Sequence, residues 1–187
     1  MASQSPQRKL ILDTLHIPFK VMPADVDEQA IVNDDPRKRA ELVARAKAEE
    51  IQINNPNSIV IAADTFTQID GRSFEKPESK REAKEMLMAQ SGKEGQALTG
   101  FCYLDGEKKL NFSTVVVTDF KFRPLSQREI AHYISNEPVT TWSAAFCPGY
   151  PSGMALVEWI KGSMTGFTHG LPIELVAKLL KESGVKI

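Results

Sequence analysis

The chain has 187 residues, a formal net charge of −1 and a sequence pI of about 6.3. Hydrophobic residues make up 42% of it and charged residues 25%, which is ordinary globular usage and indicates neither a disordered nor a fibrous protein. We expect one folding domain over residues 1–187. The near-zero net charge argues against a nucleic-acid partner, but it leaves room for a local basic pocket that binds a small polyanion.

The cysteine content and the hydropathy of the chain bear on the cellular compartment in which we expect the protein. Cys102 and Cys147 do not form a close-spaced pair, and no apolar run approaches the ~20 residues that span a membrane. The N-terminal residues lack the apolar core of a secretory signal. These features predict a cytoplasmic protein with free thiols and no membrane partner.

Helical and strand patterns alternate along the chain without internal repeats, which predicts an α/β or α+β class. In the N-terminal half, the patterns predict a helix over Pro6–His16, a helix over 37–50, a strand over 59–63, a hairpin turn at Asp70-Gly71 and a helix from the Ser79 capping box to about Gln90. In the C-terminal half, they predict a hairpin with strands at 97–104 and 115–122, a capped helix from Ser126 to Ile134, a strand at Met154–Ile160 and a helix over Pro172–Ser183.

Asp64 directly follows the apolar run 59–63, so we expect a carboxylate where a buried strand meets solvent. An ionised aspartate at such a place loses hydration and needs a compensating cation, either a lysine or a divalent metal ion. The alternative interpretation is a simple strand-end cap.

Two lysines are candidates for that cation. Lys47 lies beside the apolar face of the 37–50 helix, and Lys76 precedes Pro77, which favours an extended backbone that aims the side chain. A snorkelling lysine and an ordinary surface lysine are the alternatives.

Two further segments suggest anion and metal chemistry. Ser3, Ser5 and Arg8 stand at the start of the first helix, where hydroxyls, a guanidinium and free N–H groups suit phosphate oxygens. The acidic stretch 25–28, which ends at Glu28, offers oxygen ligands for Mg²⁺. A plain N-cap and a solvated acidic loop are the respective alternatives.

In this order, these motifs closely resemble the Maf family of nucleoside triphosphate pyrophosphatases over nearly the whole chain. The matching motifs are Ala2-Ser3-Gln4-Ser5-Pro6-Gln7-Arg8, Asp27-Glu28, Ala44-Arg45-Ala46-Lys47-Ala48, Ala63-Asp64-Thr65, Lys76-Pro77, Ser91-Gly92, Thr99-Gly100 and Gly170-Leu171-Pro172. The resemblance implies an α/β fold like that of the inosine triphosphate pyrophosphatases, with a mixed twisted sheet flanked by helices. It also implies a cytoplasmic homodimer that depends on Mg²⁺ or Mn²⁺ and releases pyrophosphate and a nucleoside monophosphate from a nucleoside triphosphate.

The resemblance also implies roles for individual residues. Asp64 is expected to accept a proton or bind metal, and Glu28 is the second carboxylate for the same two roles. Lys47, Lys76 and Arg8 would neutralise the triphosphate, and Ser3 and Ser5 would hold phosphate oxygens. These assignments fit the chemistry, since hydrolysis at phosphorus requires cations at the phosphoryl oxygens and a carboxylate for the water.

Base preference in the family is implied to depend on positions that are Gln7, Thr65 and a residue near Gly149 in this chain. Thr65 matches the branch that prefers dTTP and UTP. Gln7 matches neither branch, and the stretch 140–149 lacks the lysine and glutamine of the usual D-K-A-G-A-Y-G-I-Q-G pattern. We expect a broad enzyme that favours pyrimidine triphosphates. The alternatives are a nucleotide-binding regulator of cell division with little turnover and a pyrophosphatase that prefers 7-methyl-GTP.

The family normally has a short hydrophobic strand before its first serine, and here only Met1 and Ala2 precede Ser3. We therefore expect a loosely ordered phosphate-binding loop, because chain ends fray unless other contacts hold them.

Overall fold

The computed structural model describes residues 1–187, and the chain divides into two compact units. Unit 1 comprises residues 1–65, 98–116 and 169–187, and unit 2 comprises residues 66–97 and 117–168. Three strands, β1 (Ile59–Ile69), β3 (Glu94–Asp105) and β4 (Leu110–Phe122), contribute residues to both units. Unit 1 also contains α1 (Pro6–Asp13), α2 (Pro36–Asn54) and α7 (Ile173–Glu182). The prediction of a single folding domain remains a prediction.

The five strands form one sheet in the order β2-β1-β3-β4-β5, where β2 is Arg72–Phe74 and β5 is Val157–Lys161. β2 pairs antiparallel with β1, and β5 pairs antiparallel with β4. The Gly106 N–H donates to the Ser58 carbonyl, whereas Gly95 lies against Ile69, so β1 and β3 are also antiparallel. The predicted α/β class is confirmed, but the sheet is antiparallel where we expected a mixed one, because β3 and β4 are joined by a hairpin rather than by a crossover helix.

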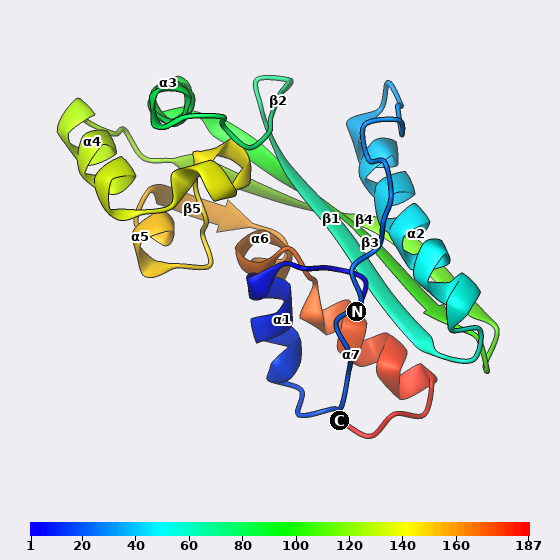
Figure 1. Ribbon diagram of the computed structural model, residues 1–187. Coiled ribbons are helices and arrows are strands. Elements are labelled where there is room, and N and C mark those ends of the chain that lie inside the picture. The colour runs from blue at the N-terminus through cyan, green and yellow to red at the C-terminus, as the bar shows by residue number, and fades with distance from the viewer. The chain divides into compact units, whose positions relative to one another are not determined.

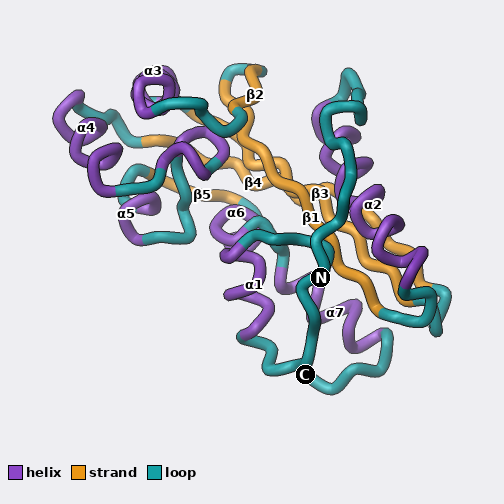
Figure 2. Tube along the Cα trace, viewed as in Figure 1, coloured by secondary structure: helices purple, strands orange, loops and turns teal.

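In unit 1 the sheet is covered on both faces, as Figure 1 and Figure 2 show. Side chains of alternate strand residues point to opposite faces. Ile61, Ala63 and Phe101 pack in a cluster with residues of α1 and α7. Val60 and Ala62 pack in another cluster with α2. β1 and β3 therefore have nearly continuous apolar runs in unit 1, because both of their faces are covered there.

Helix α2 lies unusually close to the sheet because small residues line the contact. Ala40, Ala44 and Ala48 are fully buried, one turn apart, and a methyl group added at Gly100 of β3 would overlap the Ala40 carbonyl. The contact fixes the height of α2 above the strands. It therefore determines how far the side chain of Lys47, the residue before Ala48, can reach toward the strands.

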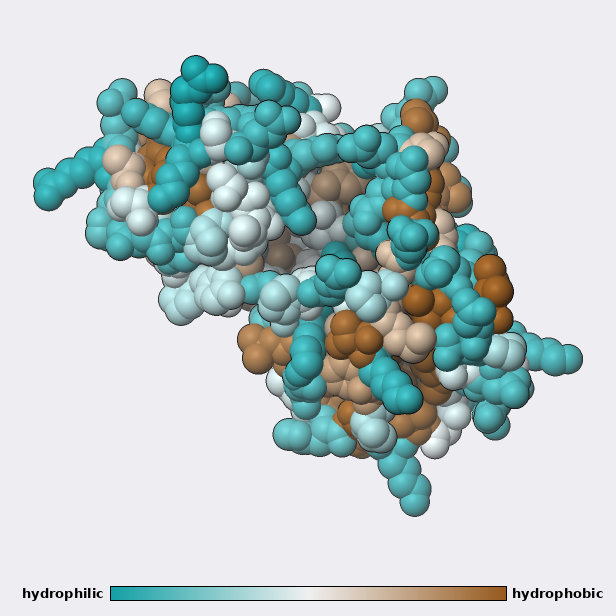
Figure 3. All heavy atoms as spheres, viewed as in Figure 1, coloured by the Kyte–Doolittle hydropathy of each residue, from teal (hydrophilic) through white to brown (hydrophobic).

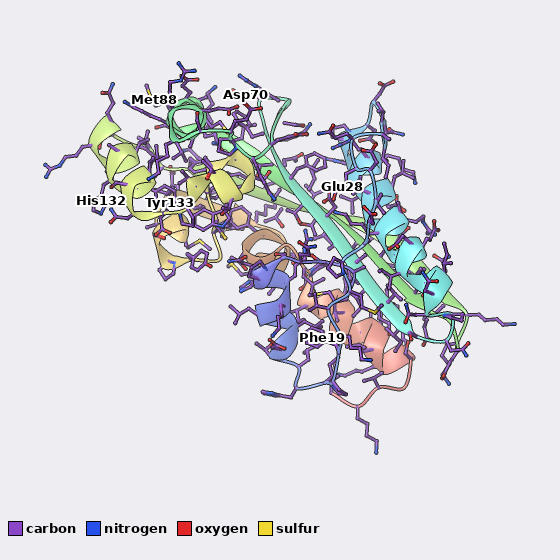
Figure 4. All side chains as sticks on the ribbon, in the orientation of Figure 1. Phe19, Glu28, Asp70, Met88, His132 and Tyr133 are labelled. Carbon is purple, nitrogen blue, oxygen red and sulfur yellow. The ribbon has the colours of Figure 1, made fainter.

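Unit 2 has an aromatic core of its own. Phe120, Phe122, Phe146 and Phe167 meet with ring centroids 4.8–6.1 Å apart, in tilted and edge-on arrangements that aromatic rings favour. Around them lie α3 (Lys80–Gln90), α4 (Gln127–Asn136), two short 3₁₀ turns (Val139–Thr141 and Ser143–Ala145), α5 (Pro151–Met154) and most of α6 (Met164–His169). Tyr133 of α4, labelled in Figure 4, also packs in this core.

Most predicted local signals are confirmed. Asp70 and Gly71 both have positive φ, as the predicted two-residue hairpin turn requires, and Asp70 lies at the turn in Figure 4. Ser126 and Glu129 form the complete predicted capping box of α4. The expected strand over 154–160 is wrong at its start, since α5 ends at Met154 and β5 begins at Val157.

The expectation of a loosely ordered N-terminus is wrong. Met1 and Ala2 are buried, the Ala2 N–H donates to the Ile61 carbonyl of β1, and the Met22 N–H donates to the Met1 carbonyl. Residues 1 and 2 thus lie hydrogen-bonded between β1 and the segment around Met22. The loop that carries Ser3 is held in place by this pairing.

No helix is long and apolar enough to cross a membrane. Both cysteines are buried and free of disulfides. Polar residues cover most of the face shown in Figure 3, and apolar side chains appear there in separate patches. Scattered exposed apolar residues of this kind are normal for a globular surface.

Candidate active site

Asp64 lies in the middle of β1, not at its end as we expected. The strand continues through Thr65, Phe66 and Thr67, which have high strand propensity, to Ile69. Because Val60 and Ala62 face α2, the same alternation directs Asp64 toward α2. Its side chain is 17% exposed, so it is a largely buried charge that requires a partner.

Lys47 of α2 is that partner. Its Nζ donates to Asp64 Oδ1 at 3.0 Å and forms an ion pair with Glu28 Oε1 at 2.8 Å. The Lys47 side chain is only 11% exposed, whereas that of Glu28 is 48% exposed. The ammonium therefore bridges the two predicted carboxylates and leaves the second oxygen of each carboxylate free of the lysine.

Glu28 comes from the segment that leads into α2, beside that helix in Figure 4. Arg39 of α2 holds this segment, because its guanidinium donates to the carbonyls of Glu28 and Ile31. Asp27 accepts the N–H groups of Gln29 and Ala30 and so stabilises the local turn. Of the acidic stretch 25–28, only Glu28 forms an ion pair with Lys47.

Arg8 forms hydrogen bonds that hold the predicted phosphate-binding residues close together. Its guanidinium donates to Ser3 Oγ at 2.9 Å, to the Gly170 carbonyl at 2.9 Å and to Thr65 Oγ1 at 3.3 Å. Burial lowers the pKa of Arg8 from its usual value, and the negative charges of Asp64 and Glu28 oppose that shift. Arg8 is thus a desolvated cation close to both carboxylates.

The two serines keep their O–H groups available as donors. Ser5 is the N-cap of α1, where its hydroxyl accepts the Arg8 N–H. The Ser3 hydroxyl accepts from the Ser5 N–H and from Arg8. Each hydroxyl therefore acts as an acceptor within the protein, and its proton can point to an anion.

Two residues without a predicted role, Thr99 and Gly170, join this cluster. Thr99 is 1% exposed, and its hydroxyl lies 3.1 Å from that of Thr65. Gly170 has φ +63° and lies so close that an added methyl group would be 2.8 Å from Thr65 Oγ1 and 3.3 Å from Arg8. The motif matches Thr99-Gly100 and Gly170-Leu171-Pro172 were the sequence signals for them.

The remaining candidates are distributed over both units. Gln7 lies on α1 in unit 1 and is partly exposed. Lys76 and Gly149 belong to unit 2, where Lys76 is exposed in the loop after β2 and Gly149 lies in the turn before α5. The contacts within unit 1 thus bring together Ser3, Ser5, Arg8, Glu28, Lys47, Asp64 and Thr65.

Two cavities of about 520 Å³ lie elsewhere, one in each unit. The first lies between the end of α2 and the β3–β4 turn, and the second lies between α4 and α5; neither is lined by a predicted site residue. No group of three or more histidine, cysteine, aspartate or glutamate side chains could hold a metal ion. Two carboxylates fit the usual Mg²⁺ arrangement, because Mg²⁺ is commonly held by one or two carboxylates together with substrate phosphates.

Two carboxylates, two partly desolvated cations and two hydroxyl donors can bind an anion and orient a water molecule beside it. These features define an α/β protein with a site suited to phosphate chemistry. The chain matches the family described as Maf-like protein over residues 1–183, and it belongs to that family.

Similar proteins are known from archaea and bacteria. The chain is 37% identical over 182 residues to a protein of Pyrococcus abyssi, covering 97% of this chain and 94% of that protein. It is 37% identical over 188 residues to a protein of Syntrophomonas wolfei, with 100% and 98% coverage, and 40% identical over 181 residues to a protein of Thermococcus onnurineus, with 96% and 94% coverage. Each of these three is named dTTP/UTP pyrophosphatase.

Proposed function

We propose that this protein hydrolyses nucleoside triphosphates to nucleoside monophosphates and pyrophosphate, with dTTP and UTP as preferred substrates. The observation that carries the proposal is the Lys47 ammonium held between Asp64 and Glu28. The names of the relatives support it, and so does the full coverage of the chain by the relative from Syntrophomonas wolfei.

Asp64 is the carboxylate that orients or deprotonates the attacking water, or binds a metal ion, and Glu28 assists in the same roles. Attack at phosphorus places negative charge on the phosphoryl oxygens and on the departing pyrophosphate. Lys47, Lys76 and Arg8 neutralise that charge. Of the three, Lys76 is assigned on the family pattern alone.

Ser3 and Ser5 bind phosphate oxygens through their O–H groups. Each hydroxyl oxygen already accepts a hydrogen bond within the protein, and Ser5 caps a helix whose N-terminal dipole favours an anion. Arg8 fixes Ser3 in place while it adds its own charge.

We further propose that Asp64 and Glu28 together bind Mg²⁺ or Mn²⁺. A bound cation would supply charge neutralisation at the phosphates and lower the pKa of a coordinated water. Lys47 would keep the two carboxylates apart and aligned.

Thr65 supports a pyrimidine preference, whereas Gln7 and the Gly149 region supply neither of the expected specificity side chains. A pocket with few side-chain partners discriminates weakly, so we expect a preference of about tenfold over other bases. The near-zero net charge favours a small nucleotide over a nucleic acid as the ligand. On the family pattern, we propose a cytoplasmic homodimer.

The test is pyrophosphate release from a panel of dTTP, UTP, CTP, ATP, GTP and 7-methyl-GTP, with and without Mg²⁺ or Mn²⁺. The proposal predicts metal-dependent release that is fastest with dTTP or UTP. Nucleotide binding without pyrophosphate release would instead identify a regulator without turnover, and a clear preference for 7-methyl-GTP would overturn the substrate assignment.

A further inference from the structure

Lys76 is a cation without a partner, and it lies on a backbone segment between two buried residues. Its side chain is exposed and makes no ion pair or hydrogen bond, yet its neighbours Phe74 and Pro77 are buried. When an unpaired lysine lies in a surface loop, both its backbone and its side chain are usually mobile. Lys76 instead follows two residues, Phe74 and Glu75, whose backbone carbonyls both accept hydrogen bonds.

Both of those carbonyls are bound by the turn at 143–144. The Ser143 hydroxyl donates to the Phe74 carbonyl at 2.8 Å, and the Ala144 N–H donates to the Glu75 carbonyl at 3.0 Å. The loop that carries Lys76 is thus fixed by a segment almost seventy positions later in the sequence. Whatever fixes that turn also fixes Lys76.

Gln90, the last residue of α3, fixes the turn. Its Nε2 donates to the Ala144 carbonyl at 2.9 Å, and the residue is fully buried. Ala144 therefore connects two segments, since its N–H bonds to Glu75 and its carbonyl bonds to Gln90.

Two features indicate that this arrangement is not kept for stability. Gln90 Oε1 is buried without a hydrogen-bond partner, which is an unfavourable state for a core amide. Ala144 and Ala145 both have a left-handed backbone, at φ +58° and +61°, which L-residues other than glycine adopt at a cost. A half-satisfied amide and two strained alanines in one small region indicate a functional constraint.

We propose that Gln90 is a positioning residue that sets the location of Lys76 through the turn at 143–144. The proposal rests on the pyrophosphatase activity proposed above and on binding of the triphosphate by Lys76. Gln90 itself contacts neither substrate nor metal. Its role is to reduce the freedom of the lysine before the anion arrives, which lowers the ordering cost of binding.

The experiment is a double-mutant cycle measured by kcat/KM for pyrophosphate release from dTTP. Gln90→Met keeps the length of the side chain and removes its donor, and it should lower kcat/KM by about tenfold. In a Lys76→Ala background, the same change should have less than about a twofold effect. Ser143→Ala removes the hydrogen bond from the turn to the Phe74 carbonyl and should give the same pattern, which keeps the test usable if Gln90→Met does not fold.

Gln52→Met is the matched control. Gln52 Nε2 donates to backbone carbonyls at Asn55, Pro56 and Ser58, and its Oε1 also lacks a partner, but it lies in unit 1. Its effect should be the same in both backgrounds. Equal effects of Gln90→Met with and without Lys76 would overturn the positioning role while leaving the enzyme intact. A wild-type protein that releases no pyrophosphate would instead remove the proposed function itself.

Discussion

Asp64 and Thr65 are neighbours on β1, and their side chains form hydrogen bonds with residues of different helices. Asp64 accepts a hydrogen bond from Lys47 of α2, whereas Thr65 accepts one from Arg8 of α1. The alternation of strand side chains produces this separation. A carboxylate and a hydroxyl from consecutive residues can thereby take part in two separate hydrogen-bond networks.

Replacing Asp64 tests the first network. Asp64→Asn keeps the size and removes the charge, so turnover should fall by at least about 10²-fold, the lower end for a general base. Circular dichroism should show a folded protein, because Lys47 retains Glu28. Asp70→Asn is the matched control, since Asp70 also pairs with a lysine, Lys93, but in an exposed hairpin. Near wild-type turnover of Asp64→Asn would refute the assigned role.

Thr99 tests the second network. Thr99→Val keeps the shape and removes the hydroxyl that meets Thr65, so kcat/KM should fall roughly 3- to 10-fold, as expected for one lost hydrogen bond of ~0.5–1.5 kcal/mol. Thr118→Val is the control, because Thr118 is equally buried on β4 but bonds the Ser163 carbonyl. If both variants lose activity equally, Thr99 has only a structural role.

The close approach of α2 predicts an effect on both stability and activity. Gly100→Ala places a methyl group against the Ala40 carbonyl and should cost about 1–3 kcal/mol. For a chain of this length, each kcal/mol lowers the melting temperature by roughly 2–4 °C. Turnover should fall by more than the loss of folded protein explains, since Lys47 moves with the helix. Gly71→Asn is the control, because nothing lies near Gly71 and asparagine tolerates its positive φ.

The cap of α4 predicts a pH dependence. Hydrogen bonds from Ser126 and Arg123 lower the pKa of Glu129 to about 2 from a usual value of 4.5. A lowered carboxyl pKa stabilises the fold above pH 4.5, and this stabilisation is lost as the pH falls toward 2. The melting temperature of Glu129→Gln should therefore lie below that of the wild type at pH 6 and converge with it near pH 2. Glu85→Gln, at an exposed pair with Arg81, is the control for the general effect of removing a surface carboxylate.

Local signals in the sequence predict local structure well. The Ser126 capping box and the Asp70-Gly71 turn depend on neighbouring residues and are confirmed. The predicted end of β1 at Asp64 is wrong, because the charge is compensated by Lys47, seventeen positions away. Pairings of that kind leave no local pattern.

The site itself could be predicted in part. Lys47, Glu28 and Arg8 were expected from the motifs to act near Asp64, and the contacts within unit 1 place them there. The hydrogen bond from Arg8 to Gly170 could not be deduced, since its acceptor is a backbone carbonyl rather than a side chain. The position of Gln90 could not be deduced either, because a buried glutamine at a helix end has the same local sequence pattern as any other helical glutamine.

The bond between Arg8 and Gly170 joins residues 162 positions apart and has a consequence for biosynthesis. Loop closure over such a distance is entropically costly, and contacts between distant parts of a chain form slowly. During translation, α1 emerges from the ribosome first, yet the residues of α7 that share its apolar cluster emerge last. The first helix must therefore remain without its final partners until nearly the whole chain has been made. A nascent chain halted at residue 160 would contain Asp64, Glu28 and Lys47 but lack the Gly170 carbonyl, one of the three acceptors of the Arg8 guanidinium.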